Sequence, residues 1–286
     1  MDPVFIGGAG RSGTTLMVDV LGLHPALSPV YETHFVVQLI DILGANASHK
    51  ETARAVHTLL TGWSETIHDM PQNKRAHERY HHGPHHLRFT PQQLLEQRDE
   101  LIAAIHEGRQ WAGLQRLVHT LFSQHAQADG KPHWINKNPS YVLRLPQLVQ
   151  LFPRMRFIHC VRDGRAAAAS VLTRPWGPKT VPEAAQWWGS RVLQGLRFQQ
   201  AYPQHALIVR YEDVLAEPER TLGAVQQWLG VPDGQLVQQH LEAGFSFDPS
   251  RGEAWRERLS AQDLADFDRI AGKILRACGY ENQAAA

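Results

Sequence analysis

The chain has 286 residues, of which 43% are hydrophobic and 20% are charged. This length allows one α/β domain with a large core, and the composition excludes a disordered or a fibrous protein. Because 29 basic residues nearly balance 28 acidic ones, we expect no nucleic-acid partner, and any anion site must be local. Two cysteines and an N-terminus without a signal peptide or long apolar stretch predict a single cytoplasmic domain, residues 1–286, with no disulfide framework and no membrane partner.

Four short apolar segments are predicted as buried strands, because each is followed by polar residues and then by a helical pattern. They are residues 4–6, 133–136, 156–161 and 206–210. Such alternation is typical of a mainly parallel sheet with helices on both faces. We therefore predict an α/β fold, a P-loop-like three-layer sandwich around a mainly parallel central sheet.

Helix signals lie between and after these strands. Residues 15–23 have helical spacing, and residues 143–152 are predicted as a helix that ends before Pro153. A capping box with a proline at the first helical position begins a helix over residues 90–106. A similar cap at Ser260 and a glycine at 279 bound the last predicted helix.

Residues 68–89 interrupt this pattern. They are polar, contain Pro71, Gly83 and Pro84, and carry six histidines, five of them within residues 77–86. No cysteine or carboxylate accompanies the histidines at a recognised zinc spacing, so we predict an exposed insertion and no metal site.

A glycine-rich loop follows the first predicted strand. Residues 8–15 read Gly-Ala-Gly-Arg-Ser-Gly-Thr-Thr, which has the spacing of a P-loop but places Thr14 where that motif has lysine. A nucleoside triphosphatase needs that lysine, together with magnesium, at the β- and γ-phosphates. Here the cation comes earlier, as Arg11, so the loop and the following helix N-terminus suit a 5′-phosphosulfate held without a metal.

A second anion site is predicted after residues 156–161. Arg162 leaves the carboxyl end of that strand, where ligands bind open α/β sheets. Asp163 is placed to cap the next helix, and Ser170 lies about two turns along it. Arg162 and Ser170 are suited to hold a second phosphate, although Arg-Asp pairs at strand ends are often structural.

Together these motifs resemble the two nucleotide-binding signatures of the PAPS-dependent sulfotransferase superfamily, where PAPS is 3′-phosphoadenosine 5′-phosphosulfate. The likeness is closest to the protein-tyrosine sulfotransferases and suggests a soluble enzyme of bacterial type. It extends, in the family's order, to residues 31–33 (Tyr-Glu-Thr), 136–139 (Asn-Lys-Asn-Pro) and 209–213 (Val-Arg-Tyr-Glu-Asp).

The resemblance implies which residues contact PAPS. Those at the 5′-phosphosulfate would be Arg11, Ser12, Gly13, Thr14 and Thr15. Those at the 3′-phosphate would be Arg162, Ser170 and Arg174, with Tyr211 near the nucleotide. Residues 246–258 resemble the loop that closes over the donor, and Arg256 would belong to the donor site.

The resemblance also implies a catalytic set, comprising Glu32, Lys137, Arg11 and Ser246. Glu32 stands at the place of the family's base, and Lys137 at that of a lysine that stabilises charge on the transferred group. A hydroxyl that attacks sulfur must lose its proton while charge builds on the departing phosphate oxygen, so a carboxylate and cations suffice. Without the resemblance, Glu32 could equally cap a helix and Lys137 could pair with a surface carboxylate.

Three departures from the tyrosine-sulfating relatives bear on the acceptor. Val30 and Asn136 replace cysteines of the secreted enzymes, His34 replaces an arginine that helps to hold acidic peptides, and the stretch from Glu32 to Lys137 is longer than in that family.

We expect the enzyme to sulfate a peptide or protein tyrosine, with acidic flanking residues favoured, and to release PAP without a metal. A sugar, lipid or small phenol is the alternative acceptor. A P-loop kinase or GTPase, with Asp163 at magnesium, and a non-catalytic nucleotide-binding protein are the alternatives of other classes. A homodimer is left open.

Overall fold

The computed structural model describes residues 2–69 and 87–280. The histidine-rich part of the predicted insertion, residues 70–86, lies outside the described residues. The prediction of an exposed insertion over residues 68–89 is therefore untested.

Five strands are present in the described part of the chain, namely β1 (Val4–Gly8), β2 (Leu27–Tyr31), β3 (His133–Lys137), β4 (Arg156–Val161) and β5 (Ala206–Arg210). They form one parallel sheet in the order β2-β3-β1-β4-β5. This confirms the predicted α/β class, and four of the strands were predicted. The fifth, β2, was missed because Ser28 and Pro29 interrupt its apolar run.

The contacts divide the chain into two compact units. The first unit comprises residues 1–5, 24–138 and 146–155, and the second unit comprises residues 6–23, 139–145 and 156–286. The single domain over residues 1–286 stays a prediction.

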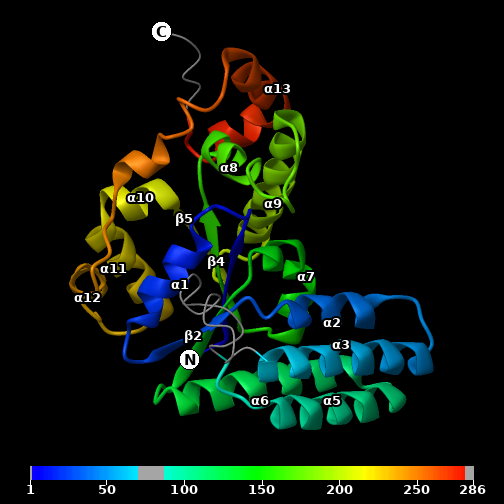
Figure 1. Ribbon diagram of the computed structural model, residues 1–286. Coiled ribbons are helices and arrows are strands. Elements are labelled where there is room, and N and C mark those ends of the chain that lie inside the picture. The colour runs from blue at the N-terminus through cyan, green and yellow to red at the C-terminus, as the bar shows by residue number, and fades with distance from the viewer. Residues whose placement is uncertain (1, 70–86, 281–286) are drawn as a thin grey trace. The chain divides into compact units, whose positions relative to one another are not determined.

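The first unit is built on long helices. They are α2 (His34–Gly44), α3 (His49–Asp69), α5 (Pro91–His106) and α6 (Gln110–Ala128). Helix α5 packs against both α3 and α6, as Figure 1 shows, and α6 covers β2 and β3. The capping box predicted for α5 is present, since the Thr90 hydroxyl accepts from the Gln93 amide and the Gln93 side chain accepts from the Thr90 amide.

The helix predicted over residues 143–152 is wrong at its start. A 3₁₀ turn, η3 (Pro139–Leu143), comes first, and α7 (Leu145–Leu151) follows. The amide of Arg144 donates to the Tyr141 carbonyl three residues back, so the chain is still in the tighter 3₁₀ turn when α7 begins.

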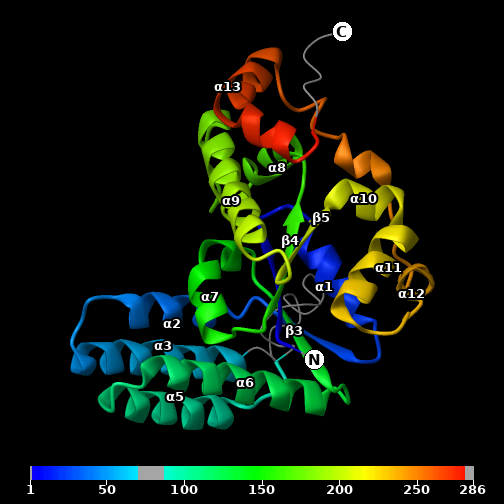
Figure 2. The same cartoon turned by 180° about the vertical axis from the view of Figure 1, so that it is seen from behind.

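Among its described residues the second unit contains, besides η3, seven α-helices and a second short 3₁₀ turn. They are α1 (Thr14–Gly22), α8 (Gly164–Val171), α9 (Val181–Ala201), α10 (Tyr211–Ala216), α11 (Pro218–Leu229), α12 (Leu236–Glu242), η4 (Pro249–Gly252) and α13 (Ala261–Ala277). Helix α9 packs against α8 and α13, which can be followed in Figure 2. Ser260 caps α13 as predicted, and Gly279 follows its end with a φ of 75°.

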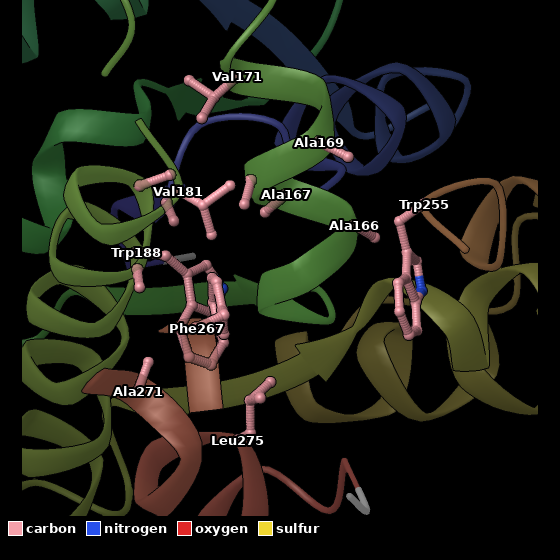
Figure 3. Close-up of a cluster of buried hydrophobic side chains, with 14 of the residues drawn as sticks. Ala166, Ala167, Ala169, Val171, Val181, Trp188, Trp255, Phe267, Ala271 and Leu275 are labelled. Carbon is pink, nitrogen blue, oxygen red and sulfur yellow. The ribbon is translucent and has the colours of Figure 1, made fainter. Parts of the chain in front are cut away.

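A cluster of buried side chains holds α8, α9 and α13 together (Figure 3). Trp188 from α9 and Phe267 from α13 lie against the alanine-rich α8, with their ring centroids 5.8 Å apart. A Cβ at Gly164, the first residue of α8, would lie 2.6 Å from the Phe267 ring. The small residues of α8 therefore allow the close packing that fixes the start of this helix.

Cys160 is buried and Cys278 is half-buried, and neither forms a disulfide in the part of the chain that the structure describes. None of the helices in the described ranges is long and apolar enough to cross a membrane.

Candidate donor site and catalytic pair

The loop after β1 forms a tight turn in the second unit. Arg11 and Gly13 both have positive φ, of 68° and 82°. A Cβ at Gly13 would lie 2.4 Å from Cδ2 of Tyr211, so this position requires glycine for its conformation and for the close approach of the ring. Gly13 is also the N-cap of α1, and the amide groups that begin α1 are therefore directed to the loop.

Ser12 gives the loop an unsatisfied polar group. Its side chain is completely buried, and its Oγ has no hydrogen-bond partner among the described residues. Because buried hydroxyls are normally paired, this oxygen favours a polar ligand at the loop. Thr14 is buried beside it, and Thr15 is exposed.

Arg11 and Ser170 meet, although 159 positions separate them in the sequence. The Arg11 Nε donates to the Ser170 Oγ at 3.0 Å, and Arg162 Nη1 donates to the Arg11 carbonyl at 3.3 Å. The three residues proposed for two different phosphates thus form one polar group that joins the loop after β1 to β4 and α8.

Arg162 is held by several elements of the second unit. Its guanidinium lies over the Tyr211 ring at 4.6 Å, and its Nη2 donates to the Arg251 carbonyl of η4. Trp188 Nε1 donates to the Arg162 carbonyl at 3.1 Å. The buried Arg162 Nε has no partner within the described ranges, which leaves a donor for an anion.

Asp163 is committed to a structural role. Its carboxylate accepts from the Arg165 amide at 2.9 Å and from the Arg165 guanidinium at 2.6 to 3.2 Å, and it caps α8 as predicted. A carboxylate neutralised in this way is poorly placed to ligate magnesium, which weakens the kinase or GTPase alternative. In the described part of the chain, no group of three or more His, Cys, Asp or Glu residues is arranged to hold a metal.

The three remaining donor-site candidates lie apart from this group in their contacts. Arg174 is exposed after α8, and Ser246 is exposed after α12. Arg256 donates to Glu253 at 2.8 Å and lies over the Trp255 ring at 4.7 Å. It is Arg251, not Arg256, whose backbone is joined to Arg162.

Glu32 and Lys137 form an ion pair in the first unit. Glu32 follows β2, Lys137 ends β3, and the register of these strands places Tyr31 beside Lys137. The amide of Glu32 donates to the Lys137 carbonyl at 2.8 Å, and Lys137 Nζ donates to the carboxylate oxygen Oε1. The Lys137 side chain is only 2% exposed, so it is no surface partner, and the carboxylate satisfies its buried charge.

The surroundings of Glu32 stabilise its ionised form. The hydrogen bond from His34 and the positive charge and hydrogen bond of Lys137 together outweigh desolvation, and they lower the pKa of Glu32 to about 2. Glu32 also has an unusual backbone, with a φ of 34°. It turns the chain from β2 into α2, and the N-cap of α2 is the next residue, Thr33.

Asn136 stabilises this turn through hydrogen bonds. It donates to the Val30 carbonyl at 3.0 Å and exchanges hydrogen bonds with Thr33 Oγ1. Asn136 and Thr33 are both fully buried. Their hydrogen bonds link β3 to the end of β2 through the residues next to Lys137 and Glu32.

Comparison with known proteins shows that residues 3–235 match the sulfotransferase family. The chain belongs to that family. It is 23% identical over 250 residues to protein-tyrosine sulfotransferase 2 of Gallus gallus, covering 85% of this chain and 54% of that protein. It is 21% identical over 248 residues to protein-tyrosine sulfotransferase of Drosophila melanogaster, covering 85% and 40%. The chain thus spans about half the length of these curated relatives.

A solved structure shares the fold of this chain. The sulfotransferase domain from the Synechococcus PCC 7002 olefin synthase superposes with a TM-score of 0.58 at 22% identity, over 95% of this chain and 94% of that chain. The expected superfamily and fold are therefore confirmed.

Two residues that contact the candidate donor site, Glu212 and Arg251, were missed from the sequence. Glu212 accepts from the Asp163 amide at 3.0 Å and from the Tyr280 hydroxyl at 2.7 Å, and the Arg251 carbonyl accepts from Arg162. The only signal for Glu212 was its place beside Tyr211. The Arg251 contact is made by a backbone oxygen, which leaves no mark on residue type.

Proposed function

We propose that this sulfotransferase transfers a sulfuryl group from PAPS to the hydroxyl of a tyrosine in a peptide or protein and releases PAP. The observation that carries the proposal is the contact between Glu32 and the buried Lys137. A carboxylate base and a cation for developing negative charge are what a hydroxyl attack on sulfur requires, and they lie in contact after two adjacent strands.

The second unit supplies what a phosphosulfate donor needs. The amides at Gly13 to Thr15, the unpaired Ser12 Oγ and Arg11 would hold the 5′-phosphosulfate. Arg162, with its unpaired Nε, and Ser170 would hold the 3′-phosphate, with the Tyr211 ring supporting Arg162. The structure connects Arg174, Ser246 and Arg256 to this group by no described contact, so the part of Arg174 and Arg256 in the donor site and of Ser246 in catalysis rests on the family resemblance.

In the transfer, the acceptor oxygen forms a bond to sulfur while the bond from sulfur to the bridging phosphate oxygen breaks. Glu32 would take the proton of the acceptor hydroxyl. With the pKa of Glu32 near 2, its resting basicity is low, and it would rise if the Lys137 ammonium left the carboxylate.

A phenol suits this base better than an aliphatic alcohol. The tyrosine hydroxyl has a pKa of about 10, so a carboxylate has less proton affinity to overcome. The curated relatives are named protein-tyrosine sulfotransferases, which supports the same acceptor. The preference for acidic flanking residues stays a prediction.

The test is mass spectrometry of acceptors incubated with PAPS and enzyme. We expect tyrosine peptides to gain a sulfuryl group, and Glu32→Gln to lower kcat by about 10²- to 10⁴-fold while PAP affinity is unchanged. Glu65→Gln, an exposed change on α3, is the matched control and should keep full activity. Sulfation of glycans or small phenols but of no tyrosine peptide would contradict the acceptor, and an active Glu32→Gln would contradict the base.

A further inference from the structure

Glu32 is held from two sides by different side chains. Lys137 from β3 binds its Oε1, and His34, the first residue of α2, lies with Nε2 3.3 Å from its Oε2. These two are the charged and titratable groups that face the carboxylate within the described first unit. Each carboxylate oxygen therefore has its own nitrogen partner.

The second ring nitrogen of His34 determines what the first one does. Asn138 Nδ2 lies 3.3 Å from His34 Nδ1, and an amide nitrogen can only donate. The Nδ1 atom is then the acceptor of a neutral ring, and the ring proton is on Nε2, pointing at Glu32. Asn138 is fully buried, so it is a fixed reference for a histidine that is itself half exposed.

This chain of contacts has a consequence if Lys137 leaves the carboxylate during transfer. Oε1 then becomes available to the acceptor hydroxyl, while Oε2 is still bound by His34. The carboxylate keeps its orientation at the moment when it must accept a proton, which is the geometric requirement for general base catalysis.

We propose that His34, oriented by Asn138, is the positioning residue of the base Glu32. The proposal rests on the proposed function, since it assigns His34 a part in that same reaction. His34 acts through Glu32 and does not contact the transferred group.

Two kinds of substitution at His34 distinguish the loss of its hydrogen-bond donor from a change in the size of its side chain. His34→Gln places an amide donor near the position of Nε2, whereas His34→Phe keeps a planar ring without a donor and His34→Asn is polar but too short to reach Oε2. His57→Phe, an exposed change on α3, is the matched control. Two loss variants, which lack the donor to Oε2, are used, so that the test can still be made with one if the other fails to fold.

The first measurement is kinetic. We expect His34→Phe and His34→Asn to lower kcat by about 10- to 100-fold, as for a lost hydrogen bond to a charged group, with the KM for PAPS unchanged. His34→Gln should recover most of the activity, and His57→Phe should match the wild type. Wild-type kcat in both loss variants would overturn the proposal, as would a His34→Gln protein as slow as His34→Phe.

The second measurement does not depend on turnover. The Glu32 carboxyl is followed by ¹³C NMR during acid titration, its signal being identified by its loss in Glu32→Gln. We expect the pKa of Glu32 to rise by about one to two pH units in both loss variants and to return in His34→Gln, because only the donor differs. An unchanged titration would overturn the proposal. If the wild type sulfates no hydroxyl acceptor, the proposed function fails, and this titration alone decides whether His34 holds Glu32.

Discussion

At the scale of single residues, the donor loop depends on a position where no side chain is tolerated. Gly13 has a φ of 82°, and the Tyr211 ring occupies the space where a Cβ would be. Tyr211 in turn supports the Arg162 guanidinium. A side chain at Gly13 would therefore move the ring and, with it, a proposed phosphate ligand.

We expect Gly13→Ala to lower PAP affinity by at least tenfold and to destabilise the fold by about 1 to 3 kcal/mol, through the positive φ and the 2.4 Å contact. Gly223→Ala is the matched control, because Gly223 is exposed inside α11 and a Cβ there meets nothing within 4 Å. It should stabilise the helix by about 0.5 to 1 kcal/mol and leave PAP binding intact. Calorimetry and urea unfolding measure both effects, and equal PAP affinity in the two variants would contradict the account of Gly13.

Residue type alone gave only part of the catalytic arrangement. Glu32 and Lys137 were selected from motifs, and the register of β2 with β3 explains why they touch. The bond from His34 to Glu32 could not be predicted, because it depends on α2 beginning two residues after Glu32 with positive φ at the turn. The sequence marked His34 only as a departure from the family.

At the scale of elements, the signals that succeeded were local. The caps of α5, α8 and α13 were predicted because the capping residues lie within a few positions of one another. Strand β2 was not predicted, because its local pattern is weak. It forms by pairing with β3, whose residues lie about a hundred positions away in the sequence. The start of α7 was missed for a local reason, because the 3₁₀ turn η3 precedes the helix.

The packing of α9 against β4 contains a buried histidine. The His159 ring is fully buried, its two nitrogens lack partners among the described residues, and Gly195 of α9 leaves the room that it fills. Burial lowers the pKa of His159 from 6.5 to about 4. Burial without a partner disfavours an imidazolium there, so the interface favours the neutral ring.

This interface should make stability depend on pH. The pKa of His159 is lower in the folded than in the unfolded chain. Above pH 6.5 the ring is neutral in both, so His159 does not make stability depend on pH there. As the pH falls towards 4 the unfolded chain binds the proton first, and stability decreases by up to on the order of 3 kcal/mol. His159→Leu should lose less stability between pH 7 and 4.5 than the wild type, whereas His119→Leu, at an exposed site on α6, should not differ from it. Urea unfolding at both pH values measures this. An equal loss of unfolding free energy in the wild type and in His159→Leu would contradict the prediction.

At the scale of the whole molecule, the candidate residues are divided between the two units. The residues assigned to PAPS all belong to the second unit, and Glu32 and Lys137 belong to the first. A nucleotide that binds the donor loop therefore has its assigned contacts with one unit only. Ligand-dependent unfolding can show whether the two units behave as the single domain expected from the sequence.

We expect PAP to stabilise the protein in the presence of EDTA, because Arg11 and Arg162 supply the positive charge that magnesium supplies in a nucleoside triphosphatase. At about a hundred times its dissociation constant, PAP should add roughly 2.7 kcal/mol to the free energy of unfolding. ATP with magnesium should add much less, since Thr14 replaces the P-loop lysine and Asp163 is bound by Arg165. Thermal unfolding with each ligand measures this.

One transition that shifts as a whole would support a single domain, and a shift confined to one of two transitions would indicate that the units unfold separately. Stabilisation by PAP that required magnesium would contradict a metal-independent donor site and favour the P-loop kinase or GTPase.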